Sequence, residues 1–379
     1  MKVRTKRNPL RRLAVAAATL LVVSLPALAA GARLDAPAGS EEVERVRAVL
    51  LASPEEGRAP GSIPARWFFK TTLPERVFEL GPRSLDHEPE RTQAITFARF
   101  VALLGVLLVS CCLFLVLAST RGHSAAWLAC MTLAALPPIA IEGAILRPEI
   151  PATVASLLAL AVLLAGLVLD RPWGVVPAMT RVAVMASLIV ASGALCGLAA
   201  AFLPQPWWLV MIPSAMLMLT TASLTIFLAR KLRRRGGDIP VLALGRRMAF
   251  WLVAMLVWPA LCAALLIVGY EPGTPALSQS HSEVVCWPQT WVARAPLLVL
   301  AGLGTLRLLG ESGRRVVRGA RLGPETVFLV FAAVVFAHQV RVGVGYDAML
   351  AAVALAVLVG EGAAGFVQAG IVGLAARRS

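Results

Sequence analysis

The chain has 379 residues, of which 58% are hydrophobic and only 15% charged, with a mean hydropathy of +0.78. Soluble domains are about 45–50% apolar and about 25% charged, so this composition excludes an ordinary soluble protein. The apolar residues form long runs, which predicts membrane-spanning helices and excludes a β-barrel. The net charge of +15 does not indicate nucleic-acid binding, because the basic residues cluster in short segments between apolar runs.

The N-terminal residues 1–32 are a basic segment followed by an apolar run over 13–30. This pattern fits a cleaved signal sequence, with Ala27-Leu28-Ala29 as the cleavage site, or a retained first transmembrane helix. Both interpretations stay open at this point. We expect retention, because the family resemblance described below requires a first span.

Residues 33–96 are the only long polar segment, and they hold a large share of the acidic residues. Ser40 followed by Glu41-Glu42-Val43-Glu44 predicts a helix start, with Ser40 as the N-cap and acids in the first turn. Apolar residues then recur at helical spacing, which predicts an amphipathic helix on the membrane surface. A second short helix is predicted over 74–80.

Nine more apolar runs follow, and with the first they predict about ten spans. They cover residues 97–118, 125–141, 152–169, 182–203, 207–228, 250–269, 296–309, 326–337 and 348–374. Residues 97–229 form a first half of the bundle, 230–248 a basic loop, and 249–379 a second half. Alternating the spans puts the basic loops in the cytoplasm, together with both termini. We therefore expect an all-α polytopic protein of the plasma (inner) membrane, with the 33–96 segment on the outside.

No metal or cofactor is predicted. The six cysteines show no CxxC pattern, and the four histidines have no metal-ligand or haem spacing. Five of the cysteines lie inside apolar runs, where cysteine usually serves as a small buried hydrophobe.

Two groups of polar residues in the C-terminal half are candidates for function. Glu361 lies inside the last apolar run, on a stripe of small residues that continues through Gly365, Ala369 and Gly373. It predicts either close helix packing with the carboxylate bonded across the interface, or a proton or ion relay. His338 closes the preceding run, just before Arg341, Tyr346 and Asp347. This group predicts either an interfacial anchor or a phosphate clamp formed by Arg341.

The order of features resembles the GT-C glycosyltransferases of the protein O-mannosyltransferase and aminoarabinose transferase type. The resemblance lies in an acidic outward segment after the first span, Arg99 near the start of the next span, the short outward loop LRPEIPA, and the late stretch AHQVRVGVGYD. It implies catalytic carboxylates at Glu41, Glu42 or Asp35, with Glu149 as a second acid. It also implies substrate-binding roles for Arg99, Arg147, Arg341 and Tyr346.

The implied reaction moves a sugar from a polyprenyl-phosphate donor to an extracytoplasmic acceptor glycan, lipid or protein, with inversion at the anomeric carbon. A helix N-terminus favours the ionised form of Glu41 and Glu42, which suits an orienting role but weakens a general base. Asp35 is therefore a serious competitor for that role. Two other functions stay open: a non-catalytic assembly partner or sensor that binds another protein, and a transporter or flippase using Glu361.

Overall fold

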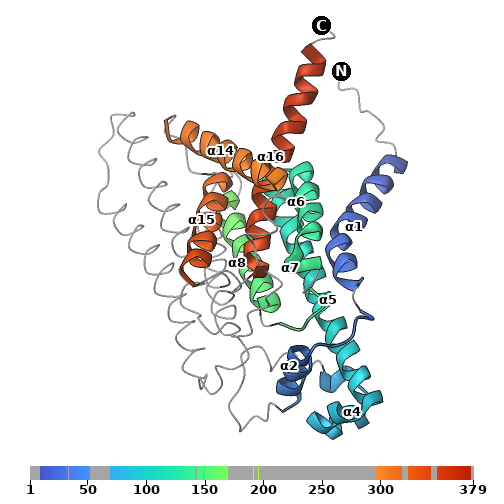
Figure 1. The fold of residues 1–379 in the computed structure, drawn as a ribbon. Helices are drawn as coiled ribbons and strands as arrows, with labels where there is room; N and C mark the ends of the chain where they lie inside the picture. The colour runs from blue at the N-terminus through green and yellow to red at the C-terminus, as the bar shows by residue number, and fades with distance from the viewer. Residues whose placement is uncertain are drawn as a thin grey trace, which may run out of the picture.

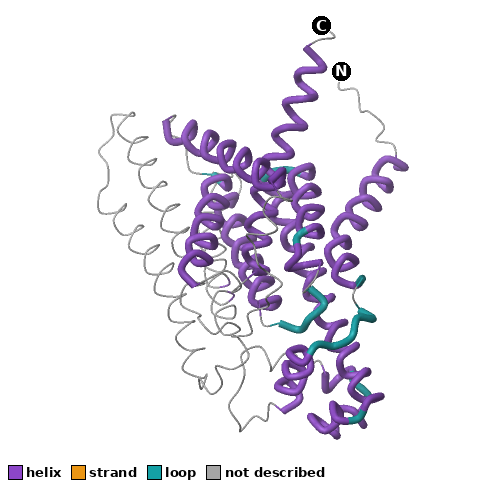
Figure 2. Tube along the Cα trace, viewed as in Figure 1, coloured by secondary structure: helices purple, strands orange, loops and turns teal. Residues whose placement is uncertain are grey.

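The computed structural model describes residues 9–32, 34–51, 69–140, 143–147, 149–169, 191, 195, 295–317, 323–342 and 348–376. Every regular element in these ranges is a helix (Figures 1 and 2). The all-α prediction is confirmed for this part of the chain. Apart from Ala191 and Leu195, the predicted spans between 182 and 269 and the basic loop 230–248 lie outside the described residues.

Four of the described helices are long and apolar enough to cross a membrane. They are α1 (Pro9–Gly31), α5 (Glu88–Thr120), α14 (Ala295–Val317) and α16 (Ala348–Ala376). Two further helices, α8 (Glu149–Leu169) and α15 (Pro324–Val342), contain shorter apolar stretches. The described part of the chain is thus all-helical, and its long apolar helices have the length and composition of a membrane protein.

Helix α5 runs from one end of the bundle to the other. Its 33 residues correspond to ~50 Å at ~1.5 Å per residue, well beyond the ~30 Å of a bilayer core. The stretch between Arg99 and Arg121 contains no charged residue and accounts for ~33 Å of that length. The span was predicted to start at residue 97, but the helix starts at Glu88. Pro89 in the first turn, with acids on either side, favours helix initiation there.

The N-terminal turns of α5 pack against a small helical unit, here called the α2–η1 unit. It consists of α2 (Ser40–Leu51), α4 (Glu75–Leu80) and the 3₁₀ helix η1 (Gly81–Asp86). These elements enclose a hydrophobic core of their own, and the Phe69 and Phe97 rings meet edge to face at 5.8 Å. Both predicted short helices are present. The first backbone hydrogen bond of α2 is accepted by Gly39 at 3.1 Å, so the cap is Gly39 and not Ser40.

The second predicted bundle span is broken into two pieces. Helix α6 (His123–Ala135) ends at Leu136, and α7 (Pro137–Ala140) is a single turn. A continuous helix over 125–141 was wrong because Pro137 and Pro138 lack the N–H needed to continue the hydrogen-bond ladder. The shortened α6 packs against α16, α5 and α1 in the main hydrophobic core.

Helix α14 is longer than predicted and crosses α16 closely (Figure 1). It was expected to end at residue 309 but continues to Val317, so the arginines assigned to a loop lie on a helix. The crossing is made by Gly304 and Gly362, since a Cβ on either would collide with the carbonyl of Leu358 or Leu300 on the other helix. The first turns of α1 and the last turns of α16 lie at this same end of the bundle.

Candidate functional site

Arg99 and Glu42 form a buried ion pair where the α2–η1 unit meets α5. Arg99 Nε donates to Glu42 Oε1 at 2.7 Å, and Nη2 donates to Oε2 at 2.7 Å. The side chains are only 7% and 5% exposed. Arg99 Nη1 also donates to the carbonyl oxygens of Leu34 and of Ala36, the latter at 2.7 Å. One arginine therefore fastens both α2 and the α1–α2 connector to α5.

This pairing changes the roles open to the predicted residues. Both carboxylate oxygens of Glu42 are occupied by Arg99, and the Nε and Nη groups of Arg99 are engaged by Glu42 and the connector. Asp35 lies between the two anchored carbonyls and is exposed to solvent. Asp35 is thus an accessible carboxylate on an anchored stretch of backbone, four residues after the end of α1.

The loop between α7 and α8 lies beside the same α2–η1 unit. Leu146 packs against the hydrophobic core formed by α2, α4 and α5. Ile150, in the first turn of α8, packs against Gly105 of α5. Arg147 is partly buried and engaged in an interaction of its own. The backbone of Glu149 begins α8, so this loop brings both predicted residues to the end of the bundle that holds Arg99.

The other predicted residues are placed by backbone alone or not at all. Glu41 lies in the first turn of α2, and His338 and Arg341 lie in the last turns of α15; their side chains fall outside the described residues. Tyr346 also lies outside the described residues. Arg341 follows Glu325 by ~24 Å along α15, since each helical residue adds ~1.5 Å.

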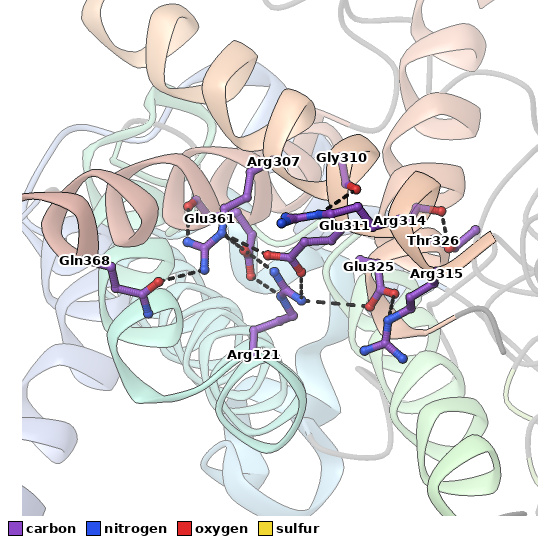
Figure 3. Close-up of polar contacts among 11 residues, drawn as sticks. Arg121, Arg307, Gly310, Glu311, Arg314, Arg315, Glu325, Thr326, Glu361 and Gln368 are labelled. Carbon is purple, nitrogen blue, oxygen red and sulfur yellow. Dashed lines mark hydrogen bonds and ion pairs between the residues drawn. The ribbon is translucent and has the colours of Figure 1, made fainter. Parts of the chain in front are cut away.

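A second polar cluster lies at the opposite end of α5, around Arg121 (Figure 3). Arg121 Nε donates to Glu361 Oε1 at 2.7 Å, and Nη2 donates to Oε2 at 2.8 Å. Nη1 donates to Glu311 Oε2 at 2.7 Å and lies 3.9 Å from Glu325 Oε2. One arginine from the α5–α6 turn therefore meets carboxylates from α14, α15 and α16.

Two arginines of α14 complete this cluster. Arg307 Nε lies 3.2 Å from Glu311 Oε1, and its Nη2 donates to Gln368 at 2.9 Å. Arg315 Nε lies 2.5 Å from Glu325 Oε1, and the Glu325 side chain has 0% exposure. Three arginines thus face three glutamates, and the cluster is electrically balanced.

The environment of Arg121 keeps it charged. Burial lowers the pKa of Arg121, but the hydrogen bonds to Glu361 and Glu311 and the charges of both glutamates raise it by more. The pKa therefore lies above its ordinary value. A permanently charged arginine on both oxygens of Glu361 favours the packing interpretation of that residue over the relay.

The small-residue stripe predicted around Glu361 makes part of the helix contacts. Gly365, in the stripe, lies against the Arg307 side chain of α14, whereas Ala369 is exposed. The closest backbone approaches are made by glycines outside the stripe, because Gly360 packs against Ala125 and Ala129 of α6 and Gly362 packs against α14.

The sequence analysis did not single out Arg121, Glu311 or Glu325 as site residues. Each sits next to an apolar run, so its charge was attributed to a connecting loop. Glu311 and Glu325 are acids in a segment otherwise rich in arginine, and this was the available signal for internal pairing.

No family model, curated protein or solved structure matches this chain. Within the described ranges, no group of three or more His, Cys, Asp or Glu residues is placed to hold a metal ion.

Proposed function

We propose that this chain is an inverting membrane glycosyltransferase that moves a sugar from a polyprenyl-phosphate donor to an extracytoplasmic acceptor, with Asp35 as general base. The observation that carries the proposal is the Arg99 clamp. It anchors the backbone on both sides of Asp35, four residues after the end of α1, and leaves the side chain exposed. A general base must be both positioned and accessible, and the anchored backbone with its exposed side chain supports Asp35 in that role.

The reaction follows from this placement. The Asp35 carboxylate accepts the proton of the acceptor hydroxyl or amine as that atom attacks the anomeric carbon of the donor sugar. The bond between that carbon and the phosphate oxygen breaks, and its electron pair leaves with the lipid phosphate. Attack opposite to the leaving group inverts the anomeric centre. Proton removal of this kind contributes ~10²–10⁴-fold in rate.

The arginines divide into two roles in this proposal. Arg99 is a positioning residue, because its donors are engaged by Glu42 and the connector. We assign Arg147 and Arg341 to the departing phosphate, where a guanidinium stabilises developing negative charge. Arg147 lies in the loop beside the α2–η1 unit, and Arg341 lies at the C-terminal end of α15. Glu149 and Tyr346 are assigned to acceptor and donor orientation.

We further propose about ten spans, both termini in the cytoplasm and a plasma-membrane location, from the distribution of basic loops. The charge-free stretch of α5 between Arg99 and Arg121 supports one full crossing by this helix, because its length of ~33 Å matches one bilayer core. The Arg99 end then faces outward with the 33–96 segment, and the Arg121 end faces the cytoplasm with both termini.

The test is transfer by the purified full-length protein. Labelled undecaprenyl-phosphate sugars and a lysate of acceptors are supplied, and incorporation of label is measured. We expect wild-type transfer, a loss of ~10²-fold or more in Asp35→Asn, and unchanged transfer in the matched control Asp86→Asn, which alters another exposed carboxylate of the same segment. Absence of transfer by the wild type, or full activity of Asp35→Asn, contradicts the proposal.

A further inference from the structure

The C-terminal end of α14 carries arginine donors that the balanced cluster around Arg121 does not use. Arg314 Nε donates to the Gly310 carbonyl at 3.2 Å, and within the described part of the chain this is its polar contact. Arg315 contacts Glu325 through Nε, and Figure 3 shows its two terminal nitrogens directed away from that carboxylate. Each guanidinium group therefore uses its Nε in a contact and leaves its terminal N–H donors available.

The charge at this end of the helix is uneven. Arg121, Arg307 and Arg315 face Glu311, Glu325 and Glu361 in the cluster. Arg314 is the additional cation, and no carboxylate of the described residues lies within ion-pair distance of it. This end of α14 therefore has an excess positive charge that attracts an anion.

Exposed apolar side chains lie on the face of α14 next to Arg314. Leu306 is 67% exposed and Leu309 is 53% exposed, and Val317, in the same last turn as Arg314, is 87% exposed. A helix end that pairs exposed leucine and valine side chains with basic residues suits the boundary between acyl chains and headgroups.

We infer that the positively charged end of α14 binds the phosphate of an anionic phospholipid, with Arg314 as the contacting residue and Arg315 adding positive charge from the side of the helix that faces α15. The acyl chains lie along the exposed apolar face of α14. Arginine binds phosphate through paired N–H donors, and each guanidinium here is already oriented by its Nε contact. Pre-orientation lowers the ordering cost of binding. The site lies at the end of the bundle opposite Asp35 and is independent of the proposed transferase reaction.

Native mass spectrometry of the purified full-length protein with added phosphatidylglycerol or phosphatidylcholine tests this inference. We expect preferential retention of phosphatidylglycerol by the wild type and about thirtyfold weaker retention by Arg314→Gln/Arg315→Gln, given roughly 1 kcal/mol per basic residue. The matched control Arg83→Gln/Arg91→Gln removes two exposed arginines at the opposite end of the bundle, one in η1 and one in the first turns of α5, and should retain the preference. Excess inorganic phosphate should not displace the lipid.

Because Arg315 also neutralises buried Glu325, two further variants separate binding from folding. Arg314→Gln leaves that ion pair intact and should still weaken phosphatidylglycerol retention several-fold. Arg314→Gln/Arg315→Gln/Glu325→Gln removes the stranded carboxylate and should bind as weakly as the double variant. Equal retention of both lipids by the wild type, or undiminished phosphatidylglycerol retention by Arg314→Gln and the triple variant, overturns the inference. Displacement by inorganic phosphate overturns it in favour of a simple anion site.

Discussion

Arg121 and Glu361 lie 240 positions apart in sequence, yet the two side chains are joined by hydrogen bonds of 2.7 and 2.8 Å. This contact ties the turn between α5 and α6 to the middle of α16. Glu361 is 1% exposed, so its negative charge depends on Arg121 for compensation. Burying an ion costs several kcal/mol unless a well-placed partner offsets it.

Substitution of Arg121 by glutamine should therefore be among the most destabilising changes in this part of the chain. Arg121→Gln removes the cation that is hydrogen-bonded to both Glu361 and Glu311 and, among the described residues, leaves Glu361 with only Arg307, at 3.9 Å. We expect a loss of about 3–5 kcal/mol in the free energy of unfolding. Thermal or denaturant unfolding of the detergent-purified protein measures this loss.

The double variant Arg121→Gln/Glu361→Gln distinguishes a lost pair from a generally damaged site. We expect it to be more stable than Arg121→Gln, because no uncompensated carboxylate remains at position 361. Arg47→Gln is the exposed control. Its 3.4 Å contact with Asp86 lies at the surface and should contribute at most about 1 kcal/mol. Strictly additive losses for Arg121 and Glu361 would argue against direct coupling.

The crossing of α14 and α16 should be sensitive to a single methyl group. Gly304→Ala places a Cβ against the Leu358 carbonyl, so the helices must separate, and we expect lower thermal stability of the purified protein. Gly302→Ala, two residues away on α14, has open space around its Cβ position and serves as the matched control. Alanine there should be neutral or slightly stabilising. Equal effects at both positions would show that the close crossing is not required.

Replacement of Arg99 by lysine should weaken the attachment of the α2–η1 unit and the α1–α2 connector to α5. Lysine keeps the charge but has a single ammonium group, and it cannot reach both Glu42 oxygens and two connector carbonyls at once. We expect Arg99→Lys to increase hydrogen exchange of the Leu34–Ala36 amides several-fold, with a smaller change in α2. Arg91→Lys, an exposed arginine of the same helix, is the control. Wild-type exchange in Arg99→Lys would show that a charge alone is sufficient.

Helices could be predicted from the sequence, whereas the pairs of residues that contact each other across helices could not. Apolar length and periodicity depend on neighbouring residues, so α1, α5 and the short helix α2 could be predicted from local patterns. Helix α14 was cut short because Arg307 looked like the start of a loop. Its charges are compensated by α15 and α16, which no local pattern reveals.

The candidate sites show the same division. Glu42 and Arg99 were both singled out by type and position, but in separate roles, because a separation of 57 positions hides their pairing. Glu361 was recognised as a costly buried charge, and a partner across the interface was one of its two interpretations. The identity of that partner, Arg121, depends on how α5 and α16 pack, and long-range packing cannot be read from one sequence.

The two charged ends of α5 should lie on opposite sides of the membrane. Asp86, in η1, is exposed next to the start of α5, and Gly313 of α14 is exposed near Arg121's cluster, with no atom close to its Cβ position. In a background without native cysteines, Asp86→Cys and Gly313→Cys each introduce one accessible thiol. An impermeant maleimide added to intact spheroplasts should label Asp86→Cys and leave Gly313→Cys unlabelled until the membrane is permeabilised.

The reason is the ~33 Å charge-free stretch of α5 between these ends, which fits one bilayer core and requires the ends to face different compartments. Labelling of both thiols from one side would contradict this arrangement, and labelling of Gly313→Cys alone would reverse the proposed orientation and remove Asp35 from the extracytoplasmic face.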